Sequence, residues 1–170
     1  MGGEIGNVER DFTINSLTYF MIIHELTTKL KLENLAPSDV GVIGNIWFEV
    51  ENSFFPERGR NDFAETIMAL WTAELIEIYR SKNKWLKKHL MFMDGSFEVV
   101  LCNGSPQTVH FKHDAQTKYV YNISLSLFAQ EIINCRRILL YTAAEAGWKP
   151  HISADLEYCN WLENLIQLNS

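Results

Sequence analysis

The clearest pattern in the chain is a run of apolar residues at three- and four-residue steps, which predicts an amphipathic helix over residues 61–79. The buried stripe of this helix would consist of Phe63, Ile67, Leu70, Trp71, Leu75 and Ile78. Asp62 and Glu65 have the spacing of a capping box, and acidic residues in a first turn also suit the helix dipole. We therefore expect the helix to begin close to Asn61.

Two further segments repeat the helical spacing, one over residues 126–146 and one over residues 153–168. Gly147 stands where a glycine commonly ends a helix, and Ser153 would cap the last helix. The buried stripes would be Phe128, Ile132, Cys135, Leu139, Ala143 and Ala146 in the first, and Leu156, Cys159, Leu162 and Ile166 in the second.

Alternation of apolar and polar residues predicts strands in the rest of the chain. Residues 42–50 form one such segment, with Ile46, Phe48 and Val50 on one face and Trp47 and Glu49 on the other. Two hairpin signals follow, Asp94-Gly95 and Asn103-Gly104. They separate strands expected at residues 90–93, 97–102 and 109–113, with another at 119–123.

Aromatic and β-branched residues favour one more strand at residues 17–24. Leu30 and Leu32 would lie in a returning strand, and residues 34–39 would form a turn. The order of strands, helix, strands and two helices predicts an α+β fold, with the helices on one face of a mostly antiparallel sheet. The chain has 170 residues, is 47% hydrophobic and contains no linker-like segment, so residues 1–170 are expected to form a single domain, with residues 1–10 loosely ordered.

Charge is unevenly distributed along the chain. The formal net charge is −6, which argues against a protein that coats nucleic acid. Residues 49–77 nevertheless contain seven acids and two bases, whereas residues 80–88 contain five bases and no acid. Two interpretations stay open: the acidic block could steer a basic partner towards this protein, or the two blocks could neutralise each other in the fold.

The sequence also indicates the cellular compartment of the protein. The first residues lack the features of a secretory signal, and the longest apolar run, residues 19–23, is far too short to span a bilayer. The three cysteines are widely spaced and odd in number, which is typical of reduced thiols. We expect a cytoplasmic protein without membrane contact.

Candidate catalytic residues are few. The chain has none of the common nucleotide-binding, hydrolase or zinc-protease motifs. His110 and His113 would lie on opposite faces of a strand and are poorly placed to share a metal. Cys102 is a weak candidate nucleophile, and the paired carboxylates Glu49 and Glu51 read more simply as a solvated strand face. The sequence therefore predicts no enzyme, no cofactor, no catalytic residue and no metal site.

A family resemblance rests on a string of turn and packing motifs. Phe55-Pro56-Glu57-Arg58-Gly59-Arg60-Asn61-Asp62-Phe63 leads into the first helix, and Phe92-Met93-Asp94-Gly95 precedes a strand. The helix opened by Phe128 ends in Ala146-Gly147-Trp148, before the short helix over residues 155–168. This order resembles small bacterial immunity proteins of polymorphic-toxin systems, and is similar in kind to those of contact-dependent growth inhibition. The resemblance covers roughly residues 47–168.

The resemblance implies that the protein binds a cognate toxin domain, often a nuclease, and covers its active site. Because nucleases bind phosphates, the toxin surface would be basic, and an acidic inhibitor would match it. No direct contact with nucleic acid is expected, and the sequence gives no oligomeric state. The residues predicted to bind the partner are the acids Glu49, Glu51, Glu57, Asp62 and Glu65, with Trp47 as an aromatic anchor.

Two alternatives remain open at this point. One is a small cytosolic enzyme that uses Cys102 or a histidine. The other is a regulatory module that binds RNA through the basic segment Lys82–Lys88, which also contains Trp85.

Overall fold

The computed structural model describes residues 29–50, 52–149 and 152–169. Glu51, the strand predicted at 17–24 and the loose segment predicted at 1–10 lie outside these residues.

The first sheet is antiparallel and is built around β2 (Gly41–Val50). Strand β1 (Lys29–Ser38) pairs with one edge of β2, whereas β3 (Ser53–Phe55) and β4 (Asn61–Asp62) pair with β2 at positions 48–50 and 44–45. Side chains alternate along β2 as the sequence predicts, so Ile46, Phe48 and Val50 share one face. All three are buried in the core.

The second sheet is an antiparallel meander. Its strands are β5 (Lys87–Met91), β6 (Phe97–Cys102), β7 (Thr108–His113) and β8 (Gln116–Asn122), in that order across the sheet. The two hairpin signals separate β5 from β6 and β6 from β7, as expected.

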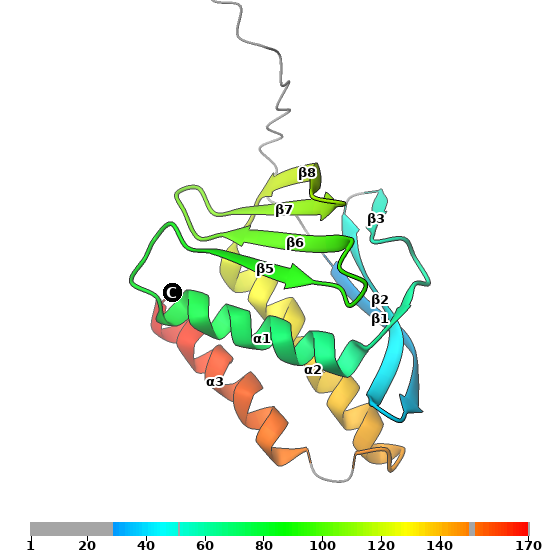
Figure 1. The fold of residues 1–170 in the computed structure, drawn as a ribbon. Coiled ribbons are helices and arrows are strands. Elements are labelled where there is room, and N and C mark those ends of the chain that lie inside the picture. Colours follow the sequence, from blue (N-terminus) through cyan, green and yellow to red (C-terminus); the bar gives the residue numbers. More distant parts are fainter. Residues whose placement is uncertain (1–28, 51, 150–151, 170) are drawn as a thin grey trace, which may run out of the picture.

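Three helices complete the fold of the described residues: α1 (Ala64–Arg80), α2 (Leu125–Glu145) and α3 (Ser153–Asn169). Helix α1 contacts β2 and β5, and α2 contacts β1, so these two helices cover the sheets. Helix α3 instead packs on α1 and α2, on the side away from the strands (Figure 1). The α+β prediction is confirmed, although the strands form two sheets and the third helix forms a separate layer.

Aromatic rings join the layers at the centre of the core. The ring of Phe48 on β2 stacks on Trp71 of α1 and on Phe128 of α2, at centroid distances of 5.4 and 5.5 Å. Phe111 of β7 meets Phe48 edge to face at 5.6 Å. One side chain of the first sheet therefore contacts two helices and the second sheet.

The predicted start of the first helix is wrong by three residues. Asn61 and Asp62 pair with β2 as β4, so the helix begins only at Ala64, and its N-cap residue Phe63 makes no side-chain capping bond. The capping box expected from Asp62 and Glu65 is absent for the same reason. Leu70 and Phe63, which were expected in the buried stripe, are exposed.

The turn predicted over residues 34–39 is replaced by a bulge. Strand β1 continues to Ser38, and its register against β2 shifts between Glu33 and Ala36. Asn34 lies there with a φ of 52°, a conformation that asparagine adopts more readily than most residues. The turn signal of this asparagine is therefore used inside a strand.

Candidate functional site

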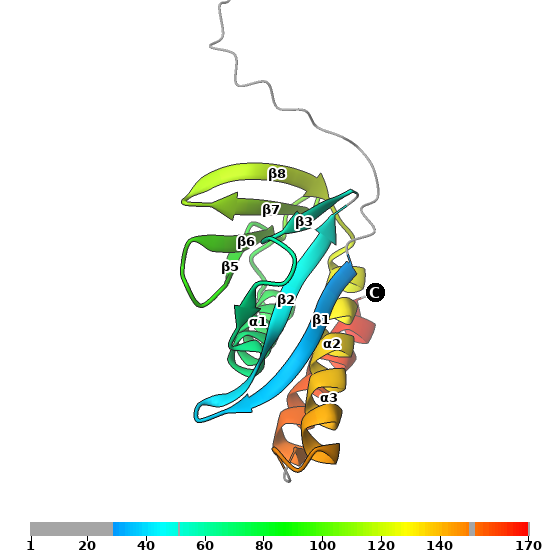
Figure 2. The same ribbon diagram turned by 90° about the vertical axis from the view of Figure 1, so that its right-hand side faces the viewer.

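The outer face of the first sheet is the face that α1 and α2 do not cover. Figure 2 looks onto this sheet, with α1 behind β2. Trp47 and Glu49 alternate with the core residues of β2 and so belong to this outer face. The loop between β3 and β4 contains Glu57 and Arg58. The Arg58 guanidinium lies over the ring of Trp47, which shows that this loop packs against the same face.

Trp47 itself is not exposed. Its exposed fraction is 1%, and the Arg58 guanidinium carbon lies 5.9 Å from the centre of its ring. Its Nε1 is buried without a hydrogen-bond partner among the described residues. The structure therefore buries the residue that the sequence predicted as an aromatic anchor, because a loop from outside the strand covers a side chain that points away from the core.

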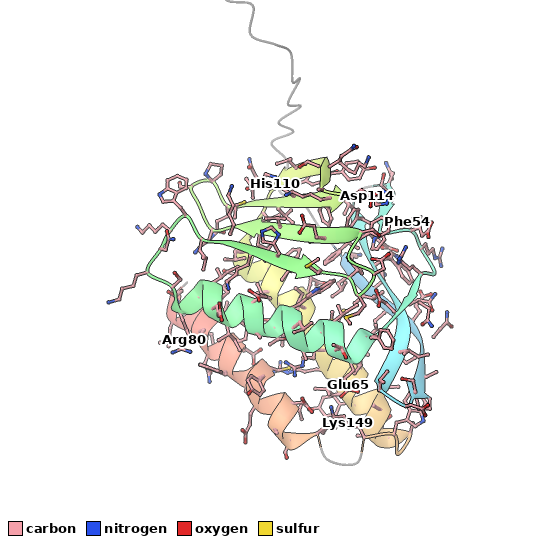
Figure 3. All side chains as sticks on the ribbon, viewed as in Figure 1. Phe54, Glu65, Arg80, His110, Asp114 and Lys149 are labelled. Atoms are coloured by element: carbon pink, nitrogen blue, oxygen red, sulfur yellow. The ribbon has the colours of Figure 1, made fainter. Side chains whose placement is uncertain are left out.

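The exposed aromatic residue on this face is Phe54. It lies on β3 directly opposite Glu49 of β2, and 47% of it is exposed (Figure 3). Sequence reasoning missed it, although the pair Phe54-Phe55 carried a signal. Two consecutive residues of a strand point to opposite faces, and Phe55 is buried against Phe111 at a centroid distance of 5.0 Å.

The two acids near Phe54 stay accessible. The Glu49 carboxylate lies 3.6 Å from Lys31 of β1, and that of Glu57 lies 3.9 Å from Arg60. The side chain of Glu57 is 78% exposed and that of Glu49 about one-third exposed. We call Glu49, Phe54 and Glu57 the sheet-face cluster.

Asp62 and Glu65 do not belong to this cluster. The Asp62 carboxylate accepts hydrogen bonds from the backbone N–H groups of Phe63, at 2.8 Å, and Met93, at 3.2 Å. Glu65 accepts one from the backbone N–H of Val42 at 3.0 Å and also pairs with Lys149 (Figure 3). Both carboxylates therefore hold separate parts of the chain together.

The acidic and basic blocks meet at Lys88. Its ammonium lies 2.8 Å from the Glu74 carboxylate and also pairs with Glu77, both on α1. The hydrogen bond from Lys88 holds the pKa of Glu77 below its usual value, and the bonds to Glu74 and Glu77 raise the pKa of Lys88. Lys88 thus neutralises part of the acidic block. Lys82, Lys84 and Lys87 have no carboxylate partner in the described chain.

Two of the three thiols lie in the core. Burial raises the pKa of Cys135 to about 12, and its Sγ donates to the backbone carbonyl of Leu30 at 3.3 Å. Burial also raises the pKa of Cys159, whereas Cys102 is half-buried at the end of β6. A thiol with a raised pKa carries little thiolate near neutral pH, so neither core cysteine is suited to nucleophilic chemistry.

The three histidines that the structure describes, His89, His110 and His113, do not form a shared metal site. Burial lowers the pKa of His110, and the positive charges of Lys112 and Lys87 lower it further. His89 instead contacts Glu98 at 2.7 Å. Within residues 29–50, 52–149 and 152–169, no three His, Cys, Asp or Glu side chains are placed to hold a metal.

The helices of the described chain include none that is long and apolar enough to cross a membrane. In comparisons with family models, curated proteins and solved structures, nothing matched the chain.

Proposed function

We propose that this protein is a bacterial immunity protein that binds a cognate toxin domain in the cytoplasm and covers its active site. The proposal combines the sequence resemblance with one structural observation, the sheet-face cluster. A half-exposed phenylalanine lies opposite Glu49 and three residues before Glu57, two accessible carboxylates, on a face that none of the described helices covers. An aromatic residue with charged neighbours is a common arrangement at the centre of a protein interface.

The cluster would work by position and charge. Phe54 would enter an apolar depression on the toxin domain, and Glu49 and Glu57 would approach the cationic residues that normally bind phosphate. Among the described residues, each carboxylate makes one ion pair, at 3.6 Å for Glu49 and 3.9 Å for Glu57, so it can exchange this partner for a cation on the toxin. Pairing of β3 with β2 fixes the backbone of Phe54 before binding.

Binding to a candidate toxin domain, sought in the genes that neighbour the one encoding this chain, tests the proposal. Phe54→Ala should raise the Kd about tenfold or more, and the pair Glu49→Lys with Glu57→Lys should slow association about tenfold and flatten its salt dependence. Two exposed residues of α2, Leu127 and Glu145, supply the matched controls. Leu127→Ala and Glu145→Lys should bind as the unmodified protein does.

Two results would contradict the proposal in different ways. Wild-type binding by the Phe54 and glutamate variants would remove the sheet-face cluster as the interface. Failure of the unmodified protein to bind the toxin domain, or to protect cells that express it, would remove the immunity function itself.

A further inference from the structure

A second exposed surface lies at the far end of the molecule, on the loop between α1 and β5. Trp85 is the most exposed of the five tryptophans, with 74% of it open to solvent. Lys82, Lys84 and Lys87 accompany it and are exposed as well. We call these four residues the basic aromatic surface. Figure 1 shows this loop at the opposite end of the molecule from β3.

The loop holds Trp85 in a defined position. The Oγ of Ser81 accepts from the backbone N–H of Asn83 at 3.0 Å, and the Oδ1 of Asn83 accepts from that of Trp85 at 2.9 Å. The backbone N–H of Asn103 donates to the carbonyl of Leu86 at 3.0 Å, which fastens the loop to the β6–β7 turn. These bonds hold the backbone that carries the exposed ring before any partner arrives.

Gly104 lets the Trp85 ring lie close to that turn. A Cβ atom at Gly104 would lie 3.1 Å from Cζ3 and 3.2 Å from Cε3 of Trp85. The benzene half of the indole therefore rests on the glycine, while most of the ring area faces solvent. Such a supported ring can stack a planar group without first losing much conformational entropy.

Alternation along β5 places two adjacent lysines on opposite faces of the strand. Lys88 points towards α1 and pairs with Glu74 and Glu77, whereas Lys87 belongs to the opposite face. In the described chain, Lys87, Lys82 and Lys84 contact no carboxylate. One exposed aromatic ring thus belongs to a segment with three exposed lysines that have no carboxylate partner among the described residues.

We propose that the basic aromatic surface binds single-stranded nucleic acid, with a base stacked on Trp85 and backbone phosphates on Lys82, Lys84 and Lys87. Lysines alone would suit any polyanion, but an exposed, supported tryptophan specifically fits a planar base. The net charge of −6 does not prevent this contact, because charges farther away than about 8 Å are largely screened at physiological ionic strength. The main sequence prediction was no nucleic-acid contact, and RNA binding through Lys82–Lys88 was the open alternative that this surface favours.

Fluorescence anisotropy with a labelled oligouridylate of about a dozen nucleotides tests the proposal, since single-strand sites span roughly 4–16 nucleotides. Trp85→Ala should weaken binding about five- to a hundredfold, whereas Trp85→Phe should retain most of it. Replacing Lys82, Lys84 and Lys87 together by alanine should reduce the slope of log K against log salt by about 2, because each single-strand phosphate contact adds roughly 0.7.

Two matched controls lie outside the surface. Trp161→Ala removes another partly exposed tryptophan on α3, and Lys118→Ala removes an exposed lysine on β8, at the other edge of the second sheet. Both should bind oligouridylate as the unmodified protein does. Far-ultraviolet circular dichroism and urea unfolding of each variant show whether it is folded.

Poly-glutamate distinguishes a base-stacking site from a merely basic one. Binding to oligouridylate that depends on Trp85, together with weaker and Trp85-independent binding to poly-glutamate, would support the proposal. It would be overturned by no binding at low salt, or by folded Trp85→Ala and Trp85→Phe variants that bind both polyanions like the unmodified protein. Toxin binding is measured separately at the sheet-face cluster, so the two proposals can fail independently.

Discussion

Asp62 connects the start of α1 to the turn after β5 through a single carboxylate. Its two oxygens accept from the backbone N–H groups of Phe63 and Met93, which are 30 residues apart in the chain. A buried N–H group that loses its acceptor is still removed from water, and no hydrogen bond offsets the free-energy cost of that removal. A residue chosen from the sequence for its surface charge therefore has a structural role.

The first prediction concerns the stability of this connection. Asp62→Ala should lower the free energy of unfolding by about 1–3 kcal/mol, because both N–H groups lose their acceptor. Urea unfolding followed by circular dichroism measures the change. Glu57→Ala is the control and should stay within about 0.5 kcal/mol of the unmodified protein, since that side chain is 78% exposed. Equal effects of the two variants would contradict the structural role of Asp62.

The second prediction concerns the thiols. Cys102 is half-buried, whereas Cys135 and Cys159 are buried and have raised pKa values. In the folded protein, Ellman's reagent at about pH 8 should modify Cys102 at least tenfold faster than the other two, because the thiolate is the reactive form. All three should react at once in urea. Rapid modification of two or three thiols without denaturant would show that the core is more open than the structure indicates.

At the scale of whole elements, local signals predicted more than long-range pairing did. The strand expected at 97–102 is found as β6 with the same bounds, because hairpin signals flank it closely in sequence. The start of α1 was missed because Asn61 and Asp62 pair with β2, some 17 residues earlier. The local sequence does not distinguish a residue in the first turn of a helix from one that pairs with a distant strand.

The candidate site shows the same limit. Alternation along β2 correctly placed Trp47 and Glu49 together on the face opposite the core. Alternation could not reveal that Arg58 would cover Trp47, since this depends on the path of a separate loop. Phe54 was predictable in part from its neighbour Phe55, but only once β3 was known to be a strand. Sequence patterns thus assigned the face, and the tertiary structure decided which of its residues are accessible.

The third prediction concerns the ion pairs that link α1 to β5. Lys88→Met should lower the free energy of unfolding near neutral pH, because Glu74 and Glu77 lose their cation. The folded-state pKa of Glu77 lies below 4.5, so its contribution is present above about pH 4.5 and is lost as the pH falls through that lowered value. The difference between Lys88→Met and the unmodified protein should therefore shrink in acid.

The alkaline side has the opposite sign. The folded-state pKa of Lys88 is raised above 10.5, so its contribution is present below that pH and is lost as the pH rises through the raised value. Urea midpoints measured from acid to neutral pH test the acidic limb. Lys82→Met is the control, because Lys82 is exposed and has no carboxylate partner in the described chain. A pH-independent effect of Lys88→Met would contradict the ion-pair explanation.

At the scale of the whole molecule, both sheets and two helices share the rings around Phe48. The exposed surfaces lie at opposite ends, so each can be altered without direct contact with the other (Figure 1). The shared core should nevertheless make the layers unfold together. The sequence predicts a single domain, and truncation of Phe48 tests whether its layers unfold cooperatively.

The fourth prediction addresses this cooperativity. Phe48→Ala should lower the free energy of unfolding by about 3–5 kcal/mol, the usual cost of truncating a buried aromatic residue. Tryptophan fluorescence and far-ultraviolet circular dichroism should give the same unfolding midpoint in both proteins. Phe54→Ala is a matched control on the same sheet and should cost far less, because Phe54 is about half exposed. Separate midpoints for the two probes would show two independent units.

The two adjacent lysines of β5 also bear on the register in which this strand pairs with β6. A one-residue insertion before β5 would let the strand slide so that Lys87 meets Glu74 and Glu77 in place of Lys88, and the ion pairs with α1 would be kept. The same slide would move Leu90, which is fully buried, to the outer face and place His89 in the core. The ion pairs with α1 therefore do not distinguish the two registers, and the buried side chains of Leu90 and Phe92 set the register of the strand that follows the Trp85 loop.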